Sequence, residues 1–223
     1  MGKNSSFYLY TICFVFSVLL AEAASRCVDA LYRRNAALFA VVPTRIPRLR
    51  RPFLVIGFLI CGMLLLSKAE SSLSDGTSLL FLIPGVFLLL IVTVTDAEQR
   101  LILDDTTLPL AALGLARSFI VSCASATYAP LLENLSAAIV GGLAFLLLAF
   151  LTRGGVGGGD VKLIAALGLW LGPHRLLTVA CAGFFLGGLA ALFLLLTRQK
   201  NRKDAFAYGP CFTLPALLVL LIG

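Results

Sequence analysis

Two aspartates, Asp96 and Asp160, have the residue type and the setting that hydrolytic chemistry needs. Asp96 follows directly on an apolar run, and Asp160 ends the stretch 154–159, in which five of six residues are glycine. Carboxyl groups that meet in a poorly solvated place cannot both ionise, so they share one proton. Such a pair can activate a water against a peptide carbonyl and protonate the departing amine. The sequence therefore predicts an acid–base pair, provided that the fold brings the two residues together.

The glycine-rich stretch before Asp160 has more than one interpretation. Residues without a Cβ allow close backbone approach, which lets a substrate strand lie against the site, and Gly157 and Gly159 are the candidates for that role. Glycines also serve helix packing in membranes, and Asp160 by itself can cap the helix that follows. A phosphate-binding loop is excluded because the pattern Gly-x-x-x-x-Gly-Lys-Ser/Thr is absent.

Three charged residues near the aspartates in the sequence are weaker candidates for the site. Lys162 either extends toward the lipid headgroups or tunes the aspartate pair electrostatically. Glu98 and Asp104 either help to position substrate or are loop charges exposed to solvent. The sequence does not decide between these alternatives.

The composition places these residues in a membrane protein. The chain has 223 residues, of which 60% are apolar and 13% charged, whereas an ordinary soluble domain is about 45–50% apolar. We therefore expect an all-α, polytopic helical bundle and no nucleic-acid partner. The six cysteines are scattered without a C-x-x-C pair, so neither a metal site nor a disulfide framework is expected, and no cofactor is implied.

About eight transmembrane helices are expected, since a crossing takes ~20 mostly apolar residues. Trp170 lies at the end of one apolar run and is predicted to anchor it at the membrane interface. The candidate runs are 7–24, 53–67, 78–95, 107–123, 135–151, 161–171, 176–196 and 207–222.

The positions of the cations predict the orientation of the bundle. If the N-terminus lies outside, the connections 26–52, 96–106, 152–162 and 197–204 lie inside, and they hold 14 of the 18 lysines and arginines. Cytoplasmic connections of membrane proteins carry such an excess. Between Asp96 and Asp160 the chain crosses twice, so both aspartates are expected on the same face, the cytoplasmic one.

The N-terminal part is treated as a separate region. Residues 1–52 are expected to form the first transmembrane helix and an arginine-rich cytoplasmic loop, and residues 53–223 the catalytic membrane domain. The loop has seven arginines, which fix topology and contact anionic lipid, and Glu22 and Asp29 are expected to pair with them. Ala21-Glu22-Ala23 also resembles a signal-peptide cleavage site, but cleavage would export the arginines, so a retained helix fits better.

Three segments resemble the type IV prepilin peptidases, which are intramembrane aspartic proteases of the GxGD type. The stretch from Asp96 to Asp104 is similar to the family's first motif, and Gly157-Gly158-Gly159-Asp160 matches its second. A weaker likeness lies in Ala207-Tyr208-Gly209-Pro210, where the family often has Phe-Gly-Pro. Together the segments extend over about residues 95–215.

The resemblance implies that Asp96 and Asp160 form a proteolytic dyad in the bacterial inner membrane, facing the cytoplasm. The implied substrate is a prepilin or pseudopilin of a type IV pilus or type II secretion system, cut between a short basic leader and an apolar helix. No metal is implied.

Two departures from the family pattern stand out. Leu103 occupies a position where the family usually has proline. Full-length members also carry paired C-x-x-C motifs in the first cytoplasmic loop and N-methylate the new pilin N-terminus, whereas the segment 26–52 has only Cys27. We therefore expect a peptidase of a short form, with N-methyltransferase activity in doubt.

Two alternative functions belong to other classes. An ion-coupled transporter would also use paired carboxylates in the membrane, but it predicts inverted repeats, and the two halves of the chain show none. A noncatalytic component of a pilus or secretion assembly would keep the fold without activity, which the presence of both Asp96 and Asp160 argues against.

The orientation can be tested with a reporter fused after Gly155. We expect it to label as cytoplasmic, because Gly155 lies in one of the cation-rich connections. An external signal would show that the number of crossings before residue 155 is wrong.

Overall fold

The described part of the structure is built from seven helices. The computed structural model describes residues 3–36, 47–71, 76–153, 155–197 and 207–222, and none of these residues forms a strand. Six of the helices are long and apolar enough to cross a membrane, and the last is shorter. The expectation of an all-α polytopic bundle is confirmed. The helices are α1 Lys3–Asn35, α2 Pro47–Ser71, α3 Gly76–Gln99, α4 Asp104–Ala124, α5 Ala129–Leu151, α6 Gly158–Leu196 and α7 Gly209–Ile222.

The described residues form two compact units that divide after Thr77, and α1 and α2 make up the first. The two helices are joined by ion pairs between Asp29 and Arg50 and between Glu22 and Arg51. Arg50 is buried and also lies over the ring of Tyr32. The acidic residues of this region therefore pair with its arginines, as expected.

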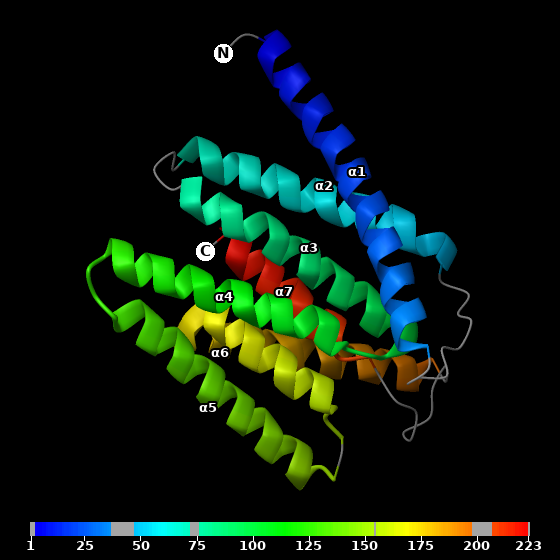
Figure 1. Ribbon diagram of the computed structural model, residues 1–223. Coiled ribbons are helices and arrows are strands. Elements are labelled where there is room, and N and C mark those ends of the chain that lie inside the picture. The colour runs from blue at the N-terminus through cyan, green and yellow to red at the C-terminus, as the bar shows by residue number, and fades with distance from the viewer. Residues whose placement is uncertain (1–2, 37–46, 72–75, 154, 198–206, 223) are drawn as a thin grey trace. The chain divides into compact units, whose positions relative to one another are not determined.

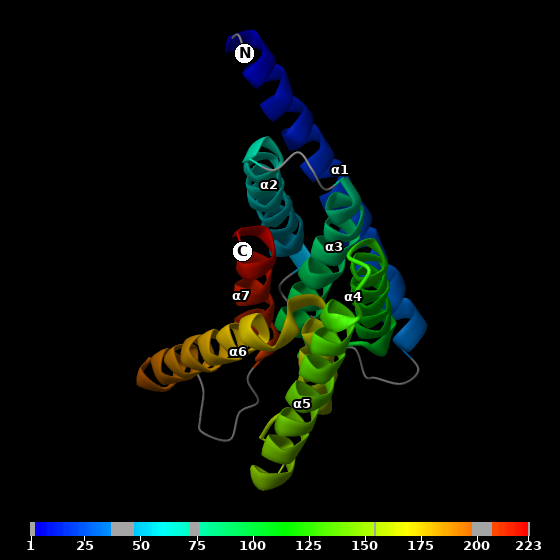
Figure 2. The same ribbon diagram turned by 90° about the vertical axis from the view of Figure 1, so that its left-hand side faces the viewer.

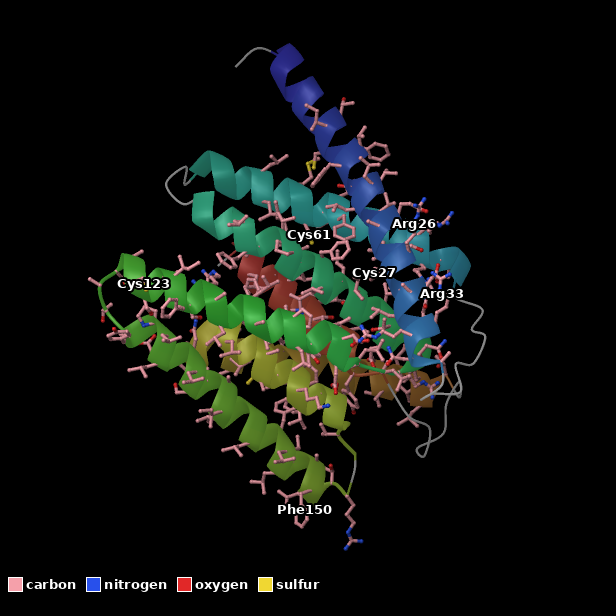
Figure 3. All side chains as sticks on the ribbon, viewed as in Figure 1. Arg26, Cys27, Arg33, Cys61, Cys123 and Phe150 are labelled. Carbon is pink, nitrogen blue, oxygen red and sulfur yellow. The ribbon has the colours of Figure 1, made fainter. Side chains whose placement is uncertain are left out.

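The arginine-rich segment is more helical than the sequence suggested. We expected a loop from 26 to 52, but α1 continues to Asn35 and α2 begins at Pro47. Figure 3 shows Arg26 and Arg33 projecting from the last turns of α1. The part of the segment from 37 to 46 lies outside the described residues. The proposed division of the chain at residue 52 concerns function rather than packing and stays a prediction.

The second unit holds α3 to α7, and α6 within it reverses its direction at Gly172. This residue has φ 71° and ψ 178°, a conformation that only glycine adopts without strain, and Pro173 starts a second arm. The sequence pattern placed the boundary between the candidate runs 161–171 and 176–196 at this position. When the two arms of α6 are counted separately, the seven described helices give eight segments.

The packing of α5 shows that the two arms of α6 run antiparallel (Figures 1 and 2). Along α5 from its start to its end, the residues that it contacts have decreasing residue numbers on the first arm of α6 and increasing residue numbers on the second arm. Ala138 faces Gly168, Gly141 lies beside Ile164 and Leu176, and Phe145 stacks on Phe184.

A small polar network stabilises the turn of α6. In a helix the carbonyl of Leu169 would accept the N–H of residue 173, but proline has none. The hydroxyl of Ser118 on α4 lies 2.9 Å from this carbonyl and can donate to it. The side-chain amide of Asn134 on α5 donates to the same hydroxyl at 2.7 Å. Helices α4, α5 and α6 thus meet at the Leu169 carbonyl, which lipid tails could not supply with a hydrogen bond.

Trp170 is a core residue of the second unit, so its prediction as an interfacial anchor is wrong. Its side chain is 2% exposed, and the indole N–H donates to the carbonyl of Leu110 at 2.8 Å. Gly85 and Gly114 lie directly against the ring. The sequence pattern could not show that two glycines on other helices leave space for the indole.

Large apolar side chains cover the outside of α5. Phe150 is 81% exposed and points away from the end of the helix in Figure 3. In water such a surface would be costly, and in a bilayer it faces acyl chains. The exposed side chains include Leu132, Leu135, Ile139, Val140, Leu143, Leu146, Leu147, Phe150 and Leu151.

The contact between α5 and α6 can be tested at Gly168. A Cβ there would lie 2.5 Å from backbone atoms of Ala138, so Gly168→Ala should destabilise the protein by about 1–3 kcal/mol. Gly188→Ala on the same helix is the control, because a Cβ there meets nothing within 4 Å and alanine has the higher helix propensity. Thermal unfolding in detergent measures both. A Gly168→Ala variant as stable as the control would contradict the packing.

Candidate active site

Asp96 lies in the last turn of α3, which continues to Gln99. The expectation of a loop directly after residue 95 is therefore wrong by one helical turn. The side chain is 5% exposed. Its Oδ2 accepts a hydrogen bond of 2.7 Å from the backbone N–H of Gly209, the first residue of α7. The carboxyl group of one helix thus meets the N-terminus of another.

Glycine is required at position 209 by this close approach. A Cβ there would lie 2.7 Å from Oδ2 of Asp96 and 2.8 Å from its Cβ and Cγ. About one turn away, the hydroxyls of Thr93 and Thr213 form a buried hydrogen bond of 2.7 Å. These two contacts join α3 to α7 and hold Asp96 in place.

Asp160 lies in the first turn of α6, three residues after the N-cap Gly157. Its Oδ2 accepts the N–H of Gly157 at 3.2 Å, so the aspartate does cap the helix. Its other oxygen, Oδ1, is buried and finds no hydrogen-bond partner among the described residues. Capping therefore accounts for one half of this carboxyl group and leaves the other half unexplained.

The structure brings the two aspartates together. Their carboxyl groups are close enough for their charges to interact, and both interact with the Cys211 thiol on α7. Each carboxylate also lies at a helix N-terminus, where the helix dipole and free N–H groups favour negative charge. The support from a second helix matters most for Asp96, because this residue lies at the C-terminal end of its own helix, where the helix dipole disfavours negative charge.

A cavity adjoins Asp160. Its volume is about 360 Å³, within the range of about 300–1,000 Å³ that is typical of ligand pockets. Mostly apolar and aromatic side chains surround the aspartate. The lining residues are Phe145, Leu148, Thr152, Gly155, Val156, Asp160, Phe184, Tyr208 and Phe212.

Lys162 and Asp104 pair with each other. The Lys162 ammonium lies 2.7 and 2.8 Å from the two carboxylate oxygens of Asp104. This pair links the first turns of α4 and α6. Both side chains are more than half exposed, so the pair adds at most about 1 kcal/mol of stability. The charge that we considered for tuning the dyad thus has a partner of its own.

The other weaker candidates are Glu98, Gly157 and Gly159, and each of them has close neighbours in the structure. Glu98 is 6% exposed, so its interpretation as a solvated loop charge is wrong. A Cβ at Gly159 would lie 2.8 Å from that of Ile102, which shows that this glycine lets the α3–α4 connection approach α6. A Cβ at Gly157 would lie 3.1 Å from Oδ2 of Asp160. Both glycines therefore serve the geometry around the dyad.

A metal-binding arrangement is not found in the described part of the chain. There, no three or more His, Cys, Asp or Glu side chains lie together in a way that could hold a metal ion.

Gly209 is the contact that sequence reasoning did not assign. The likeness of Ala207-Tyr208-Gly209-Pro210 to the family's Phe-Gly-Pro was the available signal, but sequence alone gave no role to the glycine. The partner of its N–H is 113 positions away, so only the folded chain reveals it.

Comparison with known proteins agrees with the motifs. The profile of the type IV leader peptidase family matches residues 81–192, about half of the chain. The chain therefore belongs to this family, and it is a multi-pass membrane protein by its helices. The matched region contains both aspartates and the glycine-rich stretch.

Several curated proteins named prepilin leader peptidase/N-methyltransferase are similar to the chain. The protein of Pseudomonas putida is 27% identical over 179 residues, which cover 78% of this chain and 59% of the relative. That of Aeromonas salmonicida (strain A449) is 30% identical, with 68% and 52% covered. That of Bacillus subtilis (strain 168) is 32% identical, with 62% and 54% covered. The chain thus spans about half the length of these relatives. No solved structure matches it significantly.

The contact between Gly209 and Asp96 predicts a non-additive pair of substitutions. Gly209→Ala should destabilise the protein by about 1–3 kcal/mol, because the new methyl group displaces the Asp96 carboxyl. In an Asp96→Gly background the same change should cost much less, since all the Asp96 side-chain atoms that the methyl group would meet, Cβ included, are gone. Thermal unfolding of the two single variants and the double variant measures the coupling. Purely additive effects would show that the two residues do not touch.

Proposed function

We propose that this protein is a membrane aspartic endopeptidase that removes the short basic leader from prepilin or pseudopilin precursors. Family membership and the names of the relatives support the reaction class. The observation that carries the proposal is the meeting of two buried aspartates at one end of the second unit, one of which has an oxygen without a hydrogen-bond partner among the described residues.

The dyad would work by general acid–base catalysis, with Asp96 and Asp160 sharing one proton. The ionised member removes a proton from a water molecule, whose oxygen then bonds to the scissile carbonyl carbon. The resulting tetrahedral intermediate breaks its C–N bond as the amine leaves with a proton from the pair. Hydrolysis thus returns the dyad to one proton. The proton belongs to the pair, so we assign the base role to neither residue.

The surroundings of the dyad suit an apolar peptide segment. The cavity next to Asp160 is lined by aromatic and aliphatic side chains, which favour the start of an apolar helix over a charged strand. The Oδ1 atom of Asp160 has no hydrogen-bond partner within the described ranges, and a water molecule or the substrate amide can supply one. Among the glycines before Asp160, Gly158 leaves the backbone open, since a Cβ there would meet nothing within 4 Å.

We further propose that the dyad faces the cytoplasm from a bacterial inner membrane. The excess of cations in the connections on the same side as both aspartates supports this orientation. The arginines near the end of α1 and the start of α2 would contact anionic lipid there. A leader with basic residues would also remain on this side of the membrane.

The proposal covers the peptidase reaction alone. The relatives carry a second activity in their names, but the match extends over only about half of their length. The functional division at residue 52 belongs to the proposal as well: residues 53–223 would hold the catalytic domain, and both aspartates lie within them.

Replacing either aspartate by asparagine tests the mechanism. Asp96→Asn and Asp160→Asn keep the side-chain shape but remove the shared proton, so cleavage of a membrane-embedded prepilin should fall at least about a hundredfold. Mass spectrometry of the product measures the cleavage rate and the cut site. Glu133→Gln is the matched control, since Glu133 is an exposed carboxylate outside the dyad, and it should cleave within about twofold of the wild-type rate.

Full cleavage by either aspartate variant would remove that residue from the mechanism. A variant that unfolds would leave this unclear, so the thermal unfolding of each variant is measured alongside. A folded, inactive pair of variants and an active control are the expected result.

A further inference from the structure

The cavity next to Asp160 opens to the outside between α5 and the second arm of α6. Most of its lining residues are buried or half-buried, and the exposed ones mark the opening. They are Thr152, the C-cap of α5, Gly155 in the connection that follows, and Phe184 on the second arm, which is 43% exposed. We call this opening the lateral mouth.

The two walls of the lateral mouth part within one turn beyond Phe184. At that residue the walls still touch, because its ring stacks on Phe145 of α5 with 5.4 Å between the centroids. Gly188 follows four residues later on the same face of the second arm, yet a Cβ there would meet no described atom within 4 Å. Gly187, by contrast, is covered by the ring of Tyr208. The second arm therefore leaves its face toward α5 open at residue 188, and Figure 2 shows the two helices diverging toward their C-terminal ends.

The surroundings of the lateral mouth are those of the boundary between lipid tails and headgroups. Large apolar side chains are exposed on both walls, among them Leu147 and Leu151 on α5 and Phe185 and Leu189 on the second arm. Arg153, the first charged residue after the apolar run of α5, is exposed as well, and a cation at the end of such a run extends to the headgroups. A segment embedded in the bilayer thus meets the mouth without passing through water.

The inner end of the cavity distinguishes a peptide from a lipid tail as its occupant. The Oδ1 atom of Asp160 is buried there and finds no hydrogen-bond partner in the described part of the chain. An acyl chain has no donor for this oxygen. The first turn of an apolar helix does, because the first four N–H groups of any helix have no partner within the helix. An apolar opening with an acceptor at its inner end therefore fits the start of a transmembrane helix.

We propose that the apolar helix of the precursor reaches the aspartates sideways from the bilayer, through the lateral mouth between α5 and the second arm of α6. This inference rests on the proposed function and adds to it the route and the contact surface of the substrate. The first turn of the substrate helix lies against Phe184 and Leu148, and Gly188 leaves space for its backbone. The basic leader stays on the cytoplasmic side of the mouth.

Closing the lateral mouth tests the route. Side chains on a helix lean toward its N-terminus, so Gly188→Trp places an indole over Phe184 and across the mouth. With a prepilin embedded in proteoliposomes, kcat/KM should fall about tenfold or more, mainly through KM. Leu189→Trp is the matched control, because the neighbouring Leu189 lies on the outer face of the arm and is 55% exposed. Its kcat/KM should stay within about twofold of the wild-type value.

A cross-linking measurement reports binding without cleavage. The precursor carries a photo-reactive leucine as the first residue after its leader and is mixed with the full-length Asp96→Asn protein. Mass spectrometry should locate the cross-links in residues 148–152 of α5 and residues 184–188 of α6. Introducing Gly188→Trp should remove them, whereas Leu189→Trp should not. Thermal unfolding shows whether each variant folds, and Gly188→Leu, with a several-fold loss expected, replaces the tryptophan variant if that one does not.

Wild-type cleavage of the embedded precursor by a folded Gly188 variant would overturn the lateral route. An equal loss in Leu189→Trp, or cross-links confined to other helices, would also overturn it. A wild-type protein that cleaves no precursor but cross-links at the mouth would contradict the proposed function and leave the contact surface established. A wild-type protein that does neither would overturn both.

Discussion

The hydrogen bond from the Gly209 N–H to Asp96 is the interaction on which the arrangement of the site depends. A carboxylate at the C-terminal end of α3 is opposed by its own helix dipole. The N-terminus of α7 reverses this effect and supplies a donor at 2.7 Å. Asp160 obtains the same kind of support from the first turn of α6. Both acids can therefore be buried near each other while each keeps a backbone donor.

Close helix packing makes this possible, and glycines allow it. Gly209 admits the Asp96 carboxyl, Gly159 admits Ile102, and Gly168 admits the backbone of α5. In a bilayer, burial against lipid tails provides no hydrophobic drive for helix association, so close contact and internal hydrogen bonds must provide it. The glycines thus take no part in the reaction themselves. They allow the helices to approach closely enough for their polar groups to meet.

The reversal of α6 at Gly172 connects the two ends of the second unit. Before the turn, the first arm starts at the aspartates; after it, the second arm returns along α5 and lines the cavity next to Asp160 through Phe184. The turn leaves one carbonyl open, and a hydroxyl from α4 closes it. The geometry of the site therefore depends on a polar junction at some distance from it.

The sequence by itself determined the membrane class and the approximate crossings, and it singled out the two aspartates as candidates, because hydropathy and motifs are local properties of the chain. It also located the break near Gly172, since glycine followed by proline disfavours a continuous helix. It could not reveal the burial of Trp170 and Glu98, the pairing of Lys162 with Asp104, or the donor for Asp96. Those depend on which helices touch and at what distance, and only the tertiary structure decides that.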